Sequence, residues 1–192
     1  RSESGKLSFV KGLKSLFPNK VAIFSLDPEA TRKRGCAPDV EVQLSYQDVL
    51  VEDVLLLADE LVLHSTALEA AYLLSGVFGR NWLSALLEHG NDMKGLAEKT
   101  GAHQESLGAL YRKLKRLERF PFLAKNVSGE PVVQTLLEYL DRGIHVVLEF
   151  GRQTSMLGYL LIASIITRRI HKAYVEKTEK FLSTQKASDE PR

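Results

Sequence analysis

The sequence predicts an α/β fold in which a helical block interrupts a core of short parallel strands. Residues 20–26 and 144–150 are short apolar runs bounded by helical patterns, as is typical of strands buried in a parallel sheet. From about residue 49 to 126, apolar residues recur at helical spacing and no strands alternate with the helices. We therefore expect the two strands to lie side by side and parallel, with the helical block outside their sheet.

Composition sets limits on the class of protein. Of the 192 residues, 44% are hydrophobic and 26% are charged, which is ordinary for a soluble globular chain, and a net charge of +2 does not by itself indicate nucleic-acid binding. The single cysteine, Cys36, excludes an internal disulfide and fits a reducing compartment, so we expect a cytoplasmic location. The longest apolar run, residues 156–166, is shorter than the roughly 20 residues that span a bilayer, so we expect no membrane partner. Because the chain does not begin with Met, we interpret it as a piece of a longer protein.

The first region, residues 1–48, combines helix, strand and polar loops. The spacing of apolar residues predicts a helix over 9–17, which ends at Pro18. The strand 20–26 follows, and a turn at Pro28 leads into a polar loop. Residues 40–46 alternate in polarity and predict a short strand.

The second region, residues 49–126, is predicted to be an all-helical insertion, and the third, residues 127–192, returns to α/β character. Five helices are expected in the insertion, and Ser65 or Thr66 should cap the second of them: 50–62, 65–79, 81–90, 92–101 and 104–120. The third region should hold a helix over 130–143, the strand 144–150 and one long helix over 156–183. The first half of that long helix is apolar nearly all round and is expected to be buried.

The first residues, "RSESGKL", partly match a phosphate-binding loop. The P-loop pattern is Gly, four residues, Gly-Lys and then Ser or Thr. Gly5 and Lys6 fall in place if a glycine precedes Arg1, but Leu7 takes the position of the hydroxyl that binds Mg²⁺. The helix, the strand and then Asp27 and Glu29 follow in the order found around a P-loop. The alternative is a basic N-terminus that happens to contain Gly-Lys.

Three segments, "PNKVAIFSLDPEA", "DVEVQLSYQDVLVEDVLLLADEL" and "GIHVVLEFGRQTSMLGYLLIASIITRRIHKAYVEKTEK", occur in this order. Their order and character resemble those of HerA-like ATPases, in the HerA/FtsK group of DNA translocases. The resemblance implies a partial RecA-like P-loop core with a helical insertion between Walker A and Walker B. It implies ATP and Mg²⁺ as cofactors of the parent protein. It also implies a homo-oligomeric ring, usually a hexamer, that threads duplex DNA as a translocase or helicase and often partners a nuclease.

The same resemblance assigns roles to four residues. Gly5 and Lys6 align with the Walker A loop, Asp27 with an acidic position that faces the nucleotide, and Glu29 with a second such position. The Walker B acids are expected beyond Arg192. The isolated chain is therefore expected to contain no catalytic residue, to need no cofactor and to hydrolyse no ATP.

A basic stripe is predicted on the helix 104–120. Arg112, Lys115, Arg116 and Arg119 recur at i, i+3, i+4 and i+7, beside a stripe of leucines. Such a stripe can contact the phosphates of duplex DNA; the alternative is a solvated helix face. No aromatic residue is interleaved with it, which argues against stacking on single strands.

Other polar residues give weaker signals. Glu149 ends an apolar strand as a Walker B acid does, but no second acid follows it. Arg168 and Arg169 are either surface residues of the last helix or arginines that reach a neighbour's nucleotide. The five histidines show no i, i+4 pairing, so no metal site is predicted.

Two alternative functions remain open. The chain can be a helical protein-interaction module that docks a partner such as a nuclease, or a degenerate P-loop protein that regulates a catalytic paralogue. An exposed, basic surface on the helix 104–120 favours DNA, whereas an apolar patch around it favours a protein partner.

Overall fold

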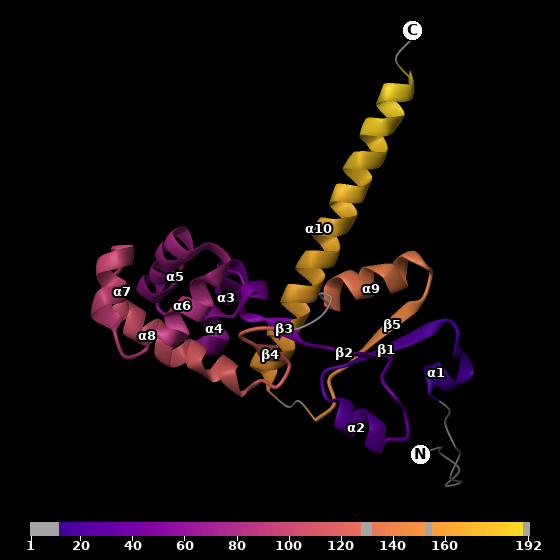
Figure 1. Cartoon of the computed structure of the whole chain (residues 1–192), viewed down its shortest axis with the longest axis horizontal. Coiled ribbons are helices and arrows are strands. Elements are labelled where there is room, and N and C mark those ends of the chain that lie inside the picture. The colour runs from indigo at the N-terminus through magenta and orange to yellow at the C-terminus, as the bar shows by residue number, and fades with distance from the viewer. Residues whose placement is uncertain (1–11, 128–131, 153–154, 190–192) are drawn as a thin grey trace. The chain divides into compact units, whose positions relative to one another are not determined.

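The computed structural model describes residues 12–127, 132–152 and 155–189 (Figure 1). The chain divides into two compact units. The sheet unit contains the chain up to Val42 and Gln134–Arg152, and the helical unit contains Gln43–Val133 and the chain from Gln153 onward. The last helix therefore groups with the helical block, whereas the sequence had suggested a single third region over 127–192.

Three parallel strands form the sheet of the first unit, in the order β2-β1-β5: β1 (Val21–Ser25), β2 (Val40–Glu41) and β5 (His145–Glu149). The pairing of β1 with β5 runs in register from Val21↔His145 to Ser25↔Glu149. This confirms the predicted parallel pairing of the two apolar runs. All five residues of β1 are buried, because a central strand of a parallel sheet is covered on both faces.

Three helices accompany this sheet: α1 (Leu13–Leu16), α2 (Pro28–Lys33) and α9 (Val132–Asp141). Tyr139 of α9 packs edge-on against Phe24 of β1, with ring centroids 5.5 Å apart. The helix α2 corrects the polar loop expected after Pro28. Pro28 occupies the first helical position, where its missing N–H costs nothing, and Asp27 caps the helix.

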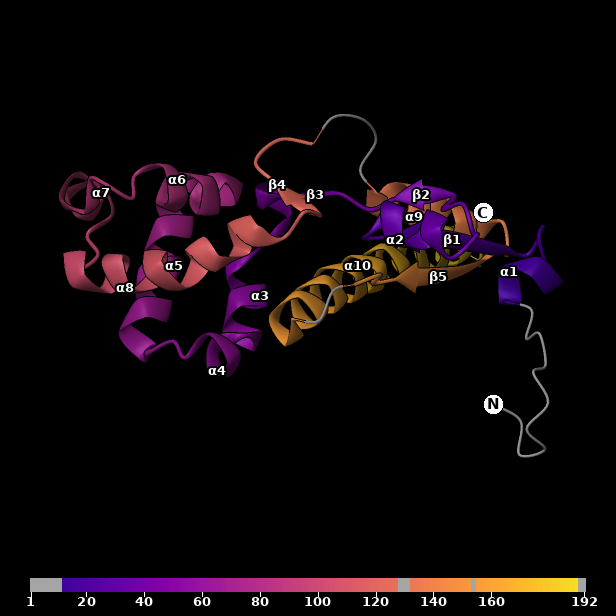
Figure 2. The same cartoon turned by 90° about the horizontal axis from the view of Figure 1, so that it is seen from below.

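The helical unit is built around α5 (Ser65–Phe78), which packs against α6 (Trp82–Glu88), α7 (Met93–Thr100) and α8 (Gln104–Leu114) (Figures 1 and 2). Its other elements are α3 (Val51–Leu56), α4 (Ala58–Leu61), α10 (Met156–Asp189) and the 3₁₀ helices η1 (Tyr46–Asp48), η2 (Gly79–Asn81) and η3 (Lys115–Arg119). The core holds fully buried leucines, and the indole of Trp82 donates a 2.9 Å hydrogen bond to the Val49 carbonyl.

Details of this unit differ from the sequence prediction. The block is not wholly helical, because β4 (Leu123–Ala124) pairs with β3 (Leu44–Ser45) in a separate parallel ladder. That ladder lies outside the sheet of β1 and β5, as expected. His64, in an extended conformation, occupies the N-cap of α5 in place of Ser65 or Thr66. The predicted helix 50–62 is broken into α3 and α4 at Leu57.

The helix α10 is buried on one face only. Leu161 and Ile165 are buried, whereas Met156 and Leu160 are 59% and 42% exposed. The expectation of burial all round its first half is therefore wrong. Among the described residues, no helix has both the length and the apolarity needed to cross a bilayer.

Candidate functional site at the carboxyl edge of the sheet

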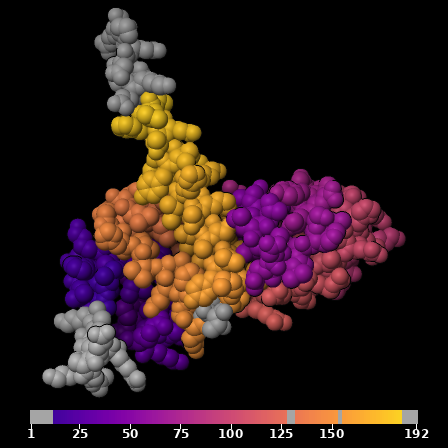
Figure 3. All heavy atoms as spheres, turned by 180° about the vertical axis from the view of Figure 1, so that it is seen from behind, coloured from indigo at the N-terminus to yellow at the C-terminus, as the bar shows by residue number. Residues whose placement is uncertain are grey.

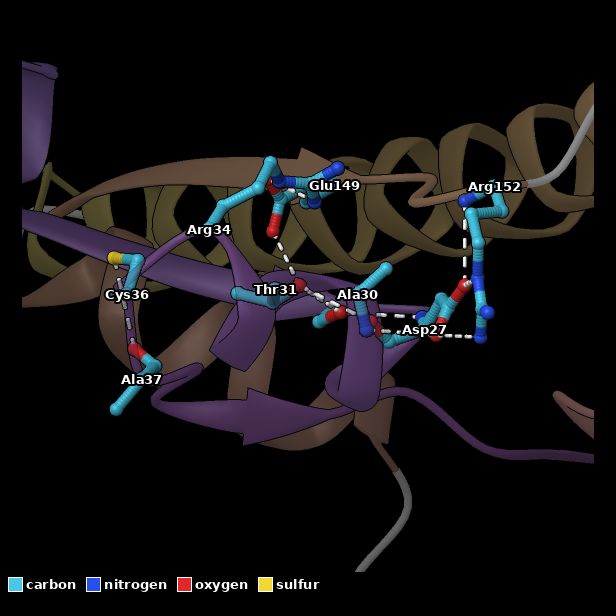
Figure 4. A network of polar contacts seen from close by, with 9 residues as sticks. Asp27, Ala30, Thr31, Arg34, Cys36, Ala37, Glu149 and Arg152 are labelled. Atoms are coloured by element: carbon cyan, nitrogen blue, oxygen red, sulfur yellow. Dashed lines mark hydrogen bonds and ion pairs between the residues drawn. The ribbon is translucent and has the colours of Figure 1, made fainter.

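The register of β1 and β5 places their carboxyl ends at one edge of the sheet. The Leu26 N–H continues the ladder by donating to the Glu149 carbonyl at 2.9 Å. The chain leaving β1 reaches Asp27 immediately, and the chain leaving β5 reaches Arg152 through Gly151. Open α/β sheets bind ligands beyond the carboxyl ends of their strands. This edge is therefore the candidate site (Figure 4).

Asp27 links the two strand ends. Its Oδ1 accepts the Ala30 N–H at 3.0 Å, which caps α2. The Arg152 guanidinium donates to the same carboxylate from Nε, 2.8 Å from Oδ2, and from Nη2, 3.2 Å from Oδ1. This two-point geometry is the strong form of an arginine–carboxylate pair. The hydrogen bond from Arg152, followed by that from Ala30, holds the pKa of Asp27 well below its usual range.

Gly151 permits this close approach. Its φ of +63° lies in the left-handed region, and a Cβ at this position would lie 2.3 Å from the Cβ of Asp27. Only glycine fits both conditions without movement of the backbone. The backbone N–H of Arg152 can therefore come within 3.3 Å of Asp27 Oδ2.

Glu149 is the centre of a second polar group at the same edge. Ser25 and Thr31 are fully buried, and their hydroxyl oxygens are hydrogen-bonded at 2.7 Å. Thr31 also donates to the Glu149 carboxylate, and Arg34 forms an ion pair with it at 2.6 Å. Glu149 thus fastens α2 to the end of β5. This position does not match the role of a Walker B acid open to a metal ion.

The electrostatics of the edge favour an anionic ligand. Asp27 and Glu149 are each engaged by a guanidinium group, so neither carboxylate is free to hold Mg²⁺. The side chains of Arg152 and Arg34 remain 64% and 48% exposed, which leaves N–H groups open to solvent. Arginine presents such donors in a geometry that matches phosphate and carboxylate oxygens. The described part of the chain contains no group of three or more His, Cys, Asp or Glu side chains arranged to bind a metal ion.

The structure brings two of the four predicted nucleotide-site residues together. Asp27 and Glu29 both lie beside Arg152, whose Nη2 is 3.8 Å from Glu29 Oε2. Gly5 and Lys6 lie outside the described residues. Sequence reasoning missed Arg152 and Thr31. A Gly-Arg pair directly after a strand is a usable signal only after the two strands are placed in register.

The basic stripe has a different geometry from the one predicted. Arg112, Lys115, Arg116 and Arg119 are all exposed, but α8 ends at Leu114 and the last three lie on η3. With three residues per turn, Arg116 aligns with Arg119, and Lys115 aligns instead with Glu118. The single line of four cations is therefore wrong.

Within this stripe, Lys115 is partly occupied. Its Nζ donates to Tyr111 Oη at 2.9 Å and lies 5.2 Å from the ring centroid. The hydrogen bond to Tyr111 raises the pKa of Lys115, and nearby Glu118 adds to the effect. Arg116 and Arg119 form no ion pair with any described residue. They are the free cations of the stripe together with Arg112.

Arg168 and Arg169 of α10 are engaged inside the helical unit. Arg168 binds Asp53, with Nη2 2.6 Å from Oδ2, and Arg169 binds Asp48. Both arginines therefore hold α10 to the segment η1–α3. In this arrangement neither is available to a neighbouring subunit.

Comparisons with protein-family models, with curated proteins and with solved structures identify no significant match.

Proposed function

We propose that the chain is part of the nucleotide-binding core of a HerA-like, RecA-related DNA translocase. Residues 49–126 correspond to the insertion between Walker A and Walker B, and the parent protein is a cytoplasmic ring ATPase. The observation that carries the proposal is the register pairing of β1 with β5 across that insertion. This pairing brings Asp27 and Arg152 together at the carboxyl edge of the sheet. Open α/β sheets bind ligands beyond that edge, which supports a nucleotide site here.

The described residues fit a phosphate better than a metal ion. Arg152 and Arg34 offer exposed donors, whereas Asp27 and Glu149 are held by these same arginines. In the parent protein, Gly5 and Lys6 would contact the phosphates of ATP, and Asp27 would position Arg152 beside them. ATP with Mg²⁺ supplies the free energy for movement on DNA. The ligands of that Mg²⁺ are expected elsewhere in the parent, since Leu7 carries no hydroxyl.

ATP hydrolysis by the parent protein tests the proposal. We expect hydrolysis that duplex DNA stimulates, and a loss of about 100-fold or more with Lys6→Ala, because the lysine charge stabilises the transferring phosphoryl group. Lys20 is an exposed lysine of the same unit, so Lys20→Ala is the matched control and should leave the rate of ATP hydrolysis unchanged. Unchanged hydrolysis in Lys6→Ala would contradict the proposal.

Calorimetry on the isolated chain should detect no micromolar binding of Mg·ATP. Binding at that level, lost in Lys6→Ala, would show that the loop tolerates Leu7.

Binding of duplex DNA by the basic stripe is a separate prediction. In the parent protein, Arg116→Glu with Arg119→Glu should weaken binding of every duplex sequence, because phosphate contacts carry no sequence information. The slope of log affinity against log salt should fall by about two units, one for each lost phosphate contact. Filter binding or anisotropy at several salt concentrations measures both quantities.

The control for this experiment makes the same change of charge elsewhere in the helical unit. Lys94→Glu with Lys99→Glu alters two exposed lysines of α7 and should leave the salt slope near the wild-type value. Equal effects of the two double variants would mean that only net charge matters. No effect of either would make the stripe a solvated surface.

Docking of a protein partner is the second candidate function, and one observation favours it. The helix α5 exposes Tyr72, Leu73 and Val77 on one side, at 47%, 40% and 52%. By contrast, no large apolar side chain of α8 or η3 is exposed, so the surface around the stripe is basic rather than apolar. A partner would therefore dock on α5, and DNA binding and docking would use different faces of the unit.

A further inference from the structure

An uncharged stripe runs along most of α10. Eight residues separated by steps of three or four form it: Met156, Leu160, Ala163, Thr167, Ile170, Tyr174, Thr178 and Phe181. At 3.6 residues per turn these positions stay within about 40° of one line, and at 1.5 Å per residue the line is about 37 Å long. The charged residues of the same stretch gather on the opposite face, apart from Lys177, which borders the stripe.

The stripe is open to solvent, whereas the opposite face of α10 contacts other residues of the helical unit. Tyr174 and Phe181 are 40% and 66% exposed, Ile170 is half-buried, and the other members are exposed. Figure 3 shows the second half of α10, in yellow, with side chains open on the viewed face. On the opposite face, Arg168 and Arg169 are bound to Asp53 and Asp48. A helix face that is free of charge for this length is typical of a face that packs against another helix.

We propose that this stripe binds the same stripe of a second copy of the chain, antiparallel and related by a two-fold axis. The sizes of the side chains carry the choice of partner. With the axis midway between Thr167 and Ile170, Tyr174 faces Ala163 of the other copy. The remaining facing pairs are Ile170 with Thr167, Met156 with Phe181 and, offset by one residue, Leu160 with Thr178.

Large residues thus face small ones through the middle of the antiparallel pair, as close packing requires. A parallel pair in register would instead set Tyr174 on Tyr174 and Ala163 on Ala163. In that arrangement the two largest rings face each other and the two alanines face each other, so side-chain sizes are less evenly matched along the stripe. The sizes therefore favour the antiparallel direction.

Area and charge are consistent with a dimer of moderate affinity. If the eight residues bury roughly 80 Å² each on average, the pair removes at most about 1,300 Å² from water, near the lower end of specific interfaces. No like charges face one another along the stripe. The helix dipoles of an antiparallel pair also oppose each other favourably.

This inference is independent of the proposed function. A ring closes through head-to-tail contacts, whereas the α10 pair is isologous, with the same surface used by both partners. It would join two free chains or two rings, and it can fail without affecting ATP hydrolysis or DNA binding.

The molar mass in solution tests the pairing. At about 100 μM, light scattering after size exclusion should give the mass of two chains, and dilution should return the monomer. Tyr174→Glu with Phe181→Glu should weaken dimerisation at least about 10-fold, because the pair would bury four carboxylates. Lys180→Gln with Ser183→Glu makes the same change of −2 in charge on the opposite face and should dimerise as the wild type does.

Circular dichroism should show both double variants folded, since all four positions are exposed. A monomeric wild type at about 100 μM would overturn the proposal. So would a Tyr174→Glu, Phe181→Glu variant that dimerises normally.

Disulfide cross-linking tests the direction. In a Cys36→Ser background the chain has no other thiol, so Leu160→Cys and Thr178→Cys can be made as separate single-cysteine proteins. Mixed under mild oxidation, they should form the mixed dimer in preference to either homodimer. Homodimers of each variant without the mixed species would reject the antiparallel register.

Discussion

Replacement of Asp53 by alanine is expected to lower the free energy of unfolding of the helical unit by about 3 kcal/mol, at the low end of the range for breaking a buried ion pair. The Asp53 side chain is fully buried and accepts three kinds of donor: the Leu50 N–H at 2.9 Å, Ser164 Oγ at 2.7 Å and the Arg168 guanidinium at 2.6 Å. Alanine leaves all of them without the carboxylate. Arg168 is 29% exposed, so water recovers part of its solvation, which is why the low end of the range applies.

Urea unfolding followed by tryptophan fluorescence measures this loss. Trp82 is the single tryptophan of the chain and lies buried in the helical unit, so its signal reports on that unit. Glu52→Ala is the matched control, because it removes an acid of the same helical turn that is exposed. Its effect should stay within about 0.5 kcal/mol. Similar losses for the two variants would show that Asp53 contributes only its charge near the start of α3.

Replacement of Gly151 by alanine is expected to destabilise the sheet unit by about 3 kcal/mol. Two costs combine. The residue has φ +63°, which a side chain adopts with strain, and the new Cβ would collide with Asp27 Cβ at 2.3 Å. Relief of the collision requires the β5 loop to move away from α2, which breaks the pairing of Arg152 with Asp27.

A second glycine of the same unit separates the two costs. Gly35 has φ +79°, and a Cβ there would meet no atom within 4 Å. Gly35→Ala should therefore lower the free energy of unfolding by about 1 kcal/mol, through the strain of the positive φ alone. Hydrogen exchange at the amides of β1 and β5 reports the stability of this unit for both variants. Equal protection in the two variants would mean that the loop after β5 absorbs the collision without loss.

Continuous apolar runs made the two main strands predictable. Residues 21–25 and 145–149 are mostly apolar, which favoured a parallel sheet for both. Only β1 is buried throughout. No residue of β5 is buried, so the expectation of a buried second strand is wrong. The helix α2 was missed although its start carries the usual signals, Asp27 at the cap and Pro28 in the first turn. Those residues were interpreted as a turn because the segment is short and polar.

One part of the candidate site could be predicted from local sequence signals, whereas the other part depends on contacts between residues far apart in the sequence. Asp27 was identifiable because an acid directly after a buried strand marks the carboxyl edge of a sheet. Its partner Arg152 lies 125 residues away, and only the register of β1 with β5 joins them. The change from α8 to η3 has no marker in the spacing of Arg112 and Arg116, so the stripe was drawn with the wrong period.

The pairing of β1 with β5 also sets the order of events during synthesis. The helices α5 to α8 contact one another over short sequence separations and can pack as soon as they leave the ribosome. Val21 must wait for His145, so β1 stays without its partner strand for about 10 s at ordinary rates of translation. During that interval the edge of β1 that later pairs with β5 is open to other nascent chains. The sheet unit, rather than the larger helical unit, is therefore the part of this polypeptide that most needs a chaperone.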